Sequence, residues 1–227
     1  VDWKRVRAVL DVGCGDGVLL VRLREQERFR GELVGIDMSE GMMRRGMRVS
    51  KKRRLDIHFL SGDAERLPFP DRRFDVIIAK HVLYHVPHVS RAVKEAYRCL
   101  TPGGKFVVVL NSKNTKPKLF AFRKKVARML KTRAFFVNRR LNIENLRPFL
   151  SRFSRASLKK FTSTTELKSP APYIRYFNSL RSFFSHMPKK TPWEKAKRMV
   201  REMVEGEIKK KGVFRENNAF GIFVATK

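Results

Sequence analysis

The sequence has few cysteines and no long apolar run. Its 227 residues include only two cysteines, Cys14 and Cys99, which fall in different predicted elements without a pairing pattern. A disulfide framework is therefore not expected, and a reduced, cytoplasmic setting fits best. No apolar stretch reaches the ~18 residues that a membrane span requires, so no membrane span is expected. The chain begins at Val1 without a visible signal peptide, and we expect that part of a leading segment is missing.

Acidic residues are scarce in the second half of the sequence, and no aspartate follows Asp75. Residues 111–227 contain 30 Lys and Arg against 7 acids, whereas residues 1–110 contain 22 against 14. A net charge of +31 is costly in self-repulsion, which favours an anionic partner such as RNA. A solvated, heat-adapted surface is the alternative. A hydrophobic content of 42% excludes a chain that is disordered throughout.

Several kinds of catalytic site are also missing. No His/Cys cluster has metal-ligand spacing, so no metal is expected. Neither cysteine lies in a proline-cysteine loop, which argues against covalent catalysis at pyrimidine C5. No Asp-Pro-Pro-Tyr or Asn-Pro-Pro-Tyr string follows the predicted strand at 74–79, which argues against an enzyme that acts on the amino group of a flipped adenine. The dinucleotide fingerprint G-x-G-x-x-G would need glycine where Val18 stands, so a dehydrogenase is disfavoured.

Strand-like and amphipathic stretches alternate as far as residue 110. The predicted strands are 7–12, 32–37, 56–60, 74–79 and 105–110, and the predicted helices are 17–28, 39–50 and 88–100. This alternation indicates βαβ units and a parallel sheet. We therefore expect an α/β fold with a doubly wound, mostly parallel seven-stranded sheet, an antiparallel last strand, and a helical cap inserted after the fifth strand.

The regular alternation of predicted strands and helices ends at residue 110. Helices are predicted at 116–131, 141–151, about 171–186 and 192–211, and strands at 155–163 and 220–226. We expect a Rossmann-like core made of residues 1–110 plus 213–227. The region 111–212 would be a basic helical cap for substrate, threaded by one core strand at about 155–163.

The run Asp11-Val12-Gly13-Cys14-Gly15-Asp16-Gly17 joins the first predicted strand to the first helix. Such a turn receives a nucleotide-like cofactor at the carboxyl end of a parallel strand. The second strand ends in Gly35-Ile36-Asp37-Met38-Ser39, and an acid at this tip can accept both ribose hydroxyls of a nucleoside. Alternatively, Asp37 or Ser39 simply caps the following helix.

Three further strings follow in order: Gly62-Asp63-Ala64-Glu65-Arg66-Leu67-Pro68-Phe69, Phe74-Asp75-Val76-Ile77-Ile78 and Leu100-Thr101-Pro102-Gly103-Gly104. Together with the glycine run, this set resembles the class I, Rossmann-like methyltransferases that use S-adenosylmethionine, in the group that includes quinone-biosynthesis enzymes. The resemblance covers residues 8–110 and extends to the final strand. It is specific for the cofactor and says little about the methyl acceptor.

The resemblance implies S-adenosyl-L-methionine as cofactor and S-adenosyl-L-homocysteine as product. It places Asp11, Gly13 and Gly15 at the methionine end. It places Asp37 on the ribose and Met38 against the adenine. It also implies that Asp63 and Ala64 contact the adenine and that Lys80 lies near the sulfonium, where we expect its side chain to point away.

The segment Lys80-His81-Val82-Leu83-Tyr84-His85-Val86-Pro87-His88 follows the fourth predicted strand and faces the cofactor position. Methyl transfer is an in-line displacement that depends on orientation and a dry pocket, and it needs a base only where the acceptor must lose a proton. His85 is the first candidate for this base, followed by Tyr84 and His81. Alternatively, His85 packs on the sheet or caps a helix.

Cations and phenylalanines interleave between residues 116 and 155. The cations can bind phosphates and the phenylalanines can stack on bases. Alternatively, the phenylalanines form the core of the cap while the cations face water. We expect methyl transfer to an O, N or C atom of a small molecule. The alternatives are a methyltransferase acting on rRNA or tRNA, and a non-catalytic module that binds nucleotides or RNA.

Overall fold

The computed structural model describes residues 1–134, 140–181, 184–185 and 193–227. They group into two compact units. Unit 1 comprises residues 1–112, 140–160 and 221–227, and unit 2 comprises residues 113–139 and 161–220. Residues 140–160 therefore group with the core strands and not with the region expected to form the cap.

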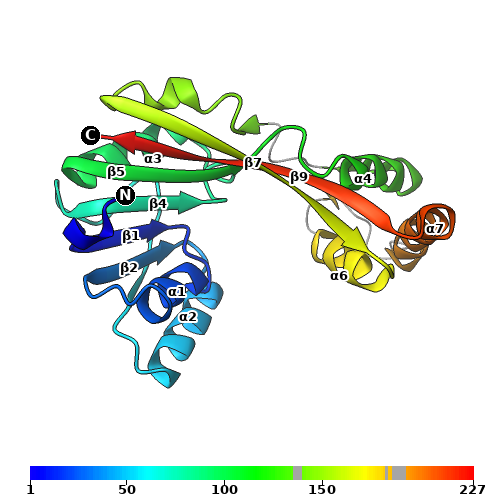
Figure 1. Cartoon of the computed structure of the whole chain (residues 1–227), viewed down its shortest axis with the longest axis horizontal. Coiled ribbons are helices and arrows are strands. Elements are labelled where there is room, and N and C mark those ends of the chain that lie inside the picture. Colours follow the sequence, from blue (N-terminus) through cyan, green and yellow to red (C-terminus); the bar gives the residue numbers. More distant parts are fainter. Residues whose placement is uncertain (135–139, 182–183, 186–192) are drawn as a thin grey trace. The chain divides into compact units, whose positions relative to one another are not determined.

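A seven-stranded sheet organises unit 1 (Figure 1). The strand order is β3-β2-β1-β4-β5-β9-β7, and β1 to β5 pair in parallel. The last strand runs antiparallel, which confirms the predicted fold class. The bounds are β1 Ala8–Val12, β2 Glu32–Asp37, β3 His58–Ser61, β4 Phe74–Lys80, β5 Leu100–Asn111, β7 Arg155–Leu167 and β9 Phe214–Thr226.

Helices cover both faces of this sheet. A short turn of helix, η1 (Trp3–Arg5), precedes β1, and the longer helices are α1 (Val18–Glu25), α2 (Glu40–Lys52) and α3 (Val89–Cys99). Alternate strand residues belong to different clusters: Leu10 and Ile77 pack with α3, whereas Val9 and Val76 pack with α1. Because both faces are covered, the central strands are mostly apolar, and all five residues of β1 are buried, Asp11 included.

The predicted helix at 141–151 is wrong. Only a 3-10 turn, η2 (Arg147–Leu150), forms there. The side chain of Asn142 accepts a hydrogen bond from the Glu144 backbone N–H (3.0 Å), and that of Asn145 accepts one from the Asn142 N–H (2.8 Å). These local bonds replace helical ones, and Pro148 cannot donate to a helical ladder.

Unit 2 packs around α4 (Pro117–Met129), α6 (Ala171–Ser179) and α7 (Trp193–Lys211). A two-stranded antiparallel sheet pairs β6 (Arg133–Ala134) with β8 (Phe184–Ser185). The core of unit 2 includes Phe122, and Phe177 lies against the Trp193 ring with centroids 5.2 Å apart. The helix predicted to reach residue 186 ends at Ser179. Among the predicted interleaved aromatics, Phe122 therefore belongs to a core, while Phe135 and Phe136 lie outside the described residues.

Strands β7 and β9 are longer than the sequence predicted. Within unit 2, Thr164 hydrogen-bonds to Asn217 (3.1 Å), and Asn218 hydrogen-bonds to Thr165 (2.9 Å). The pairing of Arg215 with Glu166 adds a salt bridge at 2.6 Å. Polar cross-strand pairs thus stabilise the parts of β7 and β9 that lie in unit 2, where the sequence shows little of the apolar alternation typical of a strand.

Candidate functional site

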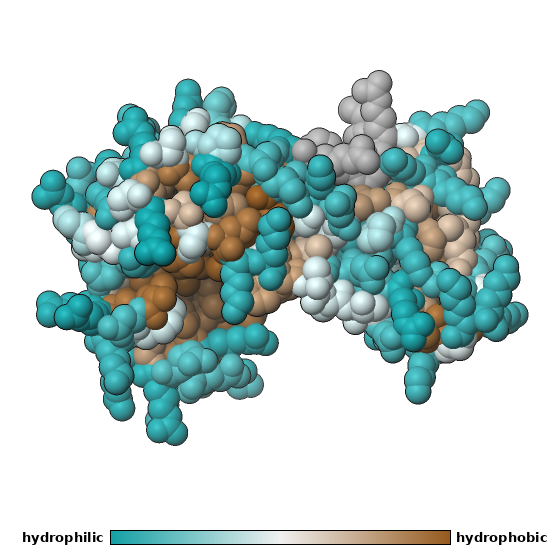
Figure 2. Space-filling view, turned by 45° about the horizontal axis from the view of Figure 1, so that its top comes forward, coloured by the Kyte–Doolittle hydropathy of each residue, from teal (hydrophilic) through white to brown (hydrophobic). Residues whose placement is uncertain are grey.

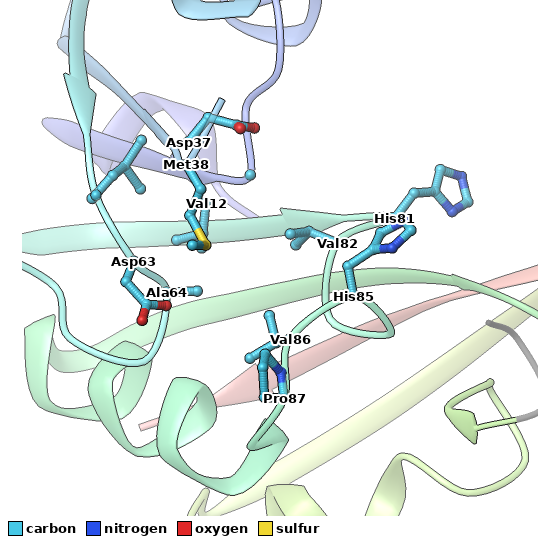
Figure 3. A pocket seen from close by; sticks show the side chains of 13 residues that line it. Val12, Asp37, Met38, Asp63, Ala64, His81, Val82, His85, Val86 and Pro87 are labelled. Carbon is cyan, nitrogen blue, oxygen red and sulfur yellow. The ribbon is translucent and has the colours of Figure 1, made fainter. Parts of the chain in front are cut away.

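The carboxyl ends of the parallel strands of unit 1 enclose a cavity of about 280 Å³ (Figure 3). The turn after β1, the tip of β2 and the loops after β3 and β4 form its walls. The lining residues are Val12, Gly13, Ile36, Asp37, Met38, Gly62, Asp63, Ala64, His81, Val82, His85, Val86 and Pro87. Figure 3 shows Asp63 and Ala64 on one side of the cavity and His81 and His85 on the other.

The glycine turn requires its glycines for two different reasons. Gly13, Gly15 and Gly17 all have positive φ, at 69°, 57° and 74°, which disfavours other residues. A Cβ at Gly13 would lie 2.3 Å from Val82 Cγ2, and one at Gly17 would lie 2.5 Å from Phe59 Cζ. Gly13 therefore lets the loop after β4 approach the turn, and Gly17 lets β3 pack against it.

Asp37 ties the glycine turn to the tip of β2. Its Oδ2 accepts a hydrogen bond from the Gly15 N–H, and its Oδ1 accepts one from the Ser39 N–H, both at 2.8 Å. Ser39 is the N-cap residue of α2, but its side chain makes no capping bond. The carboxylate of Asp37 therefore stabilises the turn before α2 by accepting the Ser39 N–H, and it also lines the cavity.

Asp11 lies in β1 and is only 3% exposed. Its Oδ1 has no hydrogen-bond partner among the described residues. Burial raises the pKa of Asp11 to about 7; the charge of Lys80 opposes this shift and that of Asp37 adds to it. Asp11 does not line the cavity, and neither do Gly15 and Lys80; Lys80 is exposed.

The loop after β3 holds Asp63 in a tight turn. The Asp63 Oδ1 accepts a hydrogen bond from the Glu65 N–H at 2.9 Å, and its backbone carbonyl accepts one from Arg66 at 3.1 Å. Asp63 and Ala64 line the cavity, and Met38, 73% exposed, stands beside them. These three predicted residues are thus brought together at one wall.

The loop after β4 carries the predicted catalytic residues. His81 has φ of 55°, and its N–H donates to the Val109 carbonyl (2.9 Å), while the His85 N–H donates to Val82 (2.8 Å). His81 and His85 line the cavity, but Tyr84 does not. The Tyr84 ring packs edge-on against His85 with centroids 4.6 Å apart. Partial burial lowers the pKa of His85, which favours its neutral imidazole.

His88 begins α3 and lies outside the cavity. The Glu65 carboxylate accepts its backbone N–H (2.7 Å) and pairs with its ring Nδ1 (3.1 Å). His88 occupies the N-cap position of α3, but its side chain makes no capping hydrogen bond. Among the described residues, no group of three or more His, Cys, Asp and Glu could hold a metal ion.

The apolar residues of the wall lie within the predicted motifs, but the sequence predicted no individual role for them. Val12, Ile36, Val82, Val86 and Pro87 line the cavity. Apolar residues next to strand ends occur in the core of any α/β protein, so this position alone does not identify a site. Within the described ranges, no helix is long and apolar enough to cross a membrane.

Comparison with known proteins agrees with this geometry. Residues 10–108 match the family described as "Methyltransferase domain". A demethylmenaquinone methyltransferase of Geobacillus sp. (strain WCH70) is 36% identical over 118 residues, which are 52% of this chain and 49% of that protein. This match assigns residues 10–108 to the methyltransferase domain family.

Other relatives of this methyltransferase domain support the same assignment. A ubiquinone/menaquinone biosynthesis C-methyltransferase of Rickettsia bellii is 34% identical over 111 residues, 46% of this chain and 44% of that protein. The chain spans about half the length of the curated relatives that it matches. The crystal structure of a putative methyltransferase from Bacillus halodurans aligns with 97% of this chain and 92% of that one, at TM-score 0.65 and 20% identity, which shows the shared fold.

Proposed function

We propose that the protein is an S-adenosylmethionine-dependent methyltransferase whose acceptor is a small molecule. The observation that carries this proposal is the convergence of the glycine turn, two carboxylates and two histidines on one cavity of about 280 Å³. Carboxylates on one side can bind a cofactor through its hydroxyl and amino groups, while a histidine on the other side can take a proton from the acceptor.

The methionine end of the cofactor would lie at the glycine turn. The buried Asp11 Oδ1 lacks a partner among the described residues, and a carboxylate oxygen in such a place is stabilised by a cationic amino group. Gly13 and Gly15 present backbone without side chains, which permits a close approach. When bound, S-adenosylmethionine supplies an electrophilic methyl group on its sulfonium sulfur.

The nucleoside end would lie at the tips of β2 and β3. Each carboxylate oxygen of Asp37 already accepts one backbone bond and retains capacity for a ribose hydroxyl. Asp63 has one oxygen in its own turn, and the other can accept the adenine amino group. Met38 offers an apolar surface for the base, and the Ala64 backbone closes the same wall.

His85 is the proposed general base, with His81 as the second candidate. Its neutral imidazole can accept the proton that an acceptor O–H or N–H releases during transfer. Tyr84 would act by positioning the His85 ring, because it packs against that ring and not into the cavity. Lys80 is exposed and lies outside the cavity lining, so solvent would screen its positive charge from a sulfonium there.

A small-molecule acceptor agrees with the names of the relatives, which methylate or help to make quinones. RNA is the second candidate, favoured by the 30 Lys and Arg of residues 111–227. The test uses the whole chain with methyl-labelled S-adenosylmethionine and two deproteinised cell fractions, total RNA and solutes below about 3 kDa plus extracted lipids. We expect label in the second fraction, and labelling about 10²- to 10⁴-fold slower with a His85→Gln variant. Label incorporated only into RNA would contradict the proposal.

A further inference from the structure

Helix α4 of unit 2 has an apolar side and a cationic side. Leu119, Phe122 and Val126 are buried in the core of unit 2, whereas Lys124, Lys125 and Arg128 are exposed. Lys131, just past the helix end, is exposed as well. The spacing of four residues places Lys124 and Arg128 on one side of the helix, about 6 Å apart along its axis. Lys131 follows the helix end with a left-handed backbone, at φ 49°. The four side chains, Lys124, Lys125, Arg128 and Lys131, are called the α4 cationic surface below.

Most of the acids of unit 2 have partners away from the α4 cationic surface. Residues 113–139 and 161–220 contain 23 Lys and Arg against six Glu and no Asp. Among the described residues, five of these glutamates have charged or hydrogen-bonding partners, none of them on the α4 cationic surface: Glu166 with Arg215, Glu194 with Lys197, Glu205 with Arg201, Glu207 with Lys118, and Glu216 with Tyr173. Within the described ranges, the four cations take part in no ion pair.

The surroundings favour a nucleic acid over a lipid surface. Binding to a membrane interface combines cations with an exposed apolar face, but the apolar side of α4 is buried. Tyr176 of α6, 40% exposed, is the one large hydrophobic residue of unit 2 that is exposed among those described. Lys116, at the N-cap of α4, lies over its ring at 4.3 Å and donates to its hydroxyl at 2.8 Å. An exposed ring beside cations can stack on an unpaired base.

We propose that the α4 cationic surface binds the phosphate backbone of single-stranded RNA, with Tyr176 offering a stacking position. Figure 2 shows hydrophilic side chains covering much of the visible outside of the protein, as expected for surfaces that are not buried in a core. Several unpaired cations in a row neutralise successive phosphates and release counterions. This inference does not rest on the methyltransferase proposal, because RNA binding needs neither the cofactor nor the cavity of unit 1.

The experiment measures the anisotropy of a fluorescent 20-nucleotide RNA of mixed sequence against the whole chain, at 50 to 300 mM KCl and without cofactor. We expect binding whose affinity falls steeply with salt. The variant K124Q/R128Q/K131Q removes three phosphate contacts, so the slope of log K against log [KCl] should decrease by about 2, with a loss of affinity of about tenfold or more at 100 mM KCl. Glutamine is a good helix former, and unchanged circular dichroism would show that the fold persists.

The matched control K197Q/R201Q/R215Q removes the same charge from unit 2, but at cations that already have glutamate partners. We expect its affinity for RNA to change less than threefold. Equal losses in both variants would overturn the proposal, since net charge alone would then explain the binding. Absence of RNA binding at 50 mM KCl would overturn it too. So would tighter binding to vesicles containing anionic phosphatidylglycerol, or to polyglutamate, than to RNA of equal charge.

Discussion

Replacement of Asp11 by asparagine should make the cofactor-free protein more stable, and by more at higher pH. The folded-state pKa of Asp11 is raised from 3.8 to about 7. A raised acid pKa means that stability is fully present below the unfolded pKa and is lost as the pH rises through the folded one. The wild-type protein therefore loses stability between pH 4 and pH 7, whereas an amide of the same shape does not titrate.

The size of this effect follows from the shift. At 1.36 kcal/mol for each pKa unit, ionisation of the buried Asp11 costs the folded state about 4 kcal/mol at pH 8 but only about 2 kcal/mol at pH 5. The gain in unfolding free energy on Asp11→Asn should therefore grow by about 2–3 kcal/mol between these two pH values. Asp56→Asn provides the control, because that carboxylate is 83% exposed.

The assay is urea unfolding followed by circular dichroism at pH 5 and pH 8, on protein freed of bound small molecules. The difference in stability between Asp11→Asn and wild type should widen with pH, whereas the difference for Asp56→Asn should not. A difference for Asp11→Asn that is the same at both pH values would refute the reasoning that Asp11 is a buried, uncompensated carboxyl group.

Three further outcomes are expected. Gly13→Ala would bring a Cβ to 2.3 Å from Val82 Cγ2, so S-adenosylhomocysteine binding should weaken by about 10- to 100-fold in calorimetry, with partial recovery on adding Val82→Ala. His85→Gln should lower kcat by about 10²- to 10⁴-fold while leaving the affinity for S-adenosylhomocysteine unchanged. The wild-type rate should fall as the pH drops through the lowered pKa of His85. A pH-independent rate would contradict the role of His85 as base. Phe177→Ala removes a fully buried ring stacked on Trp193 and should cost about 3–5 kcal/mol in urea unfolding. Tyr176→Ala should cost less, because that ring is 40% exposed.

Much of the first half of the fold could be predicted because its strands are short and mostly apolar, although β5 begins at Leu100 and not at the predicted residue 105. β1, β2 and β4 begin and end within one residue of the predicted positions. The extended parts of β7 and β9 could not be predicted, because residues such as Thr164, Asn217 and Asn218 pair through polar side chains and carry no apolar alternation. Around Asn142, the helical periodicity was misleading because side-chain bonds to the backbone compete with a helix.

The site was predicted best where a motif fixes the backbone. Gly13, Asp37 and Asp63 come together because parallel strands deliver their carboxyl ends to one edge of the sheet. The direction of a side chain on the loop after β4 was less predictable: His81 and His85 face the cavity and Tyr84 does not, a difference that depends on the positive φ of His81 and on local packing.

The central claim is that the glycine turn and the acid at the tip of β2 bind the cofactor. Isothermal titration of the whole chain with S-adenosylhomocysteine tests it most directly, with NAD as a comparison ligand. We predict heat from a single site for S-adenosylhomocysteine, none for NAD, and none for the Asp37→Ala variant, whose melting temperature the ligand should not raise. No heat with the wild-type protein, together with no change in its melting temperature, would contradict the account.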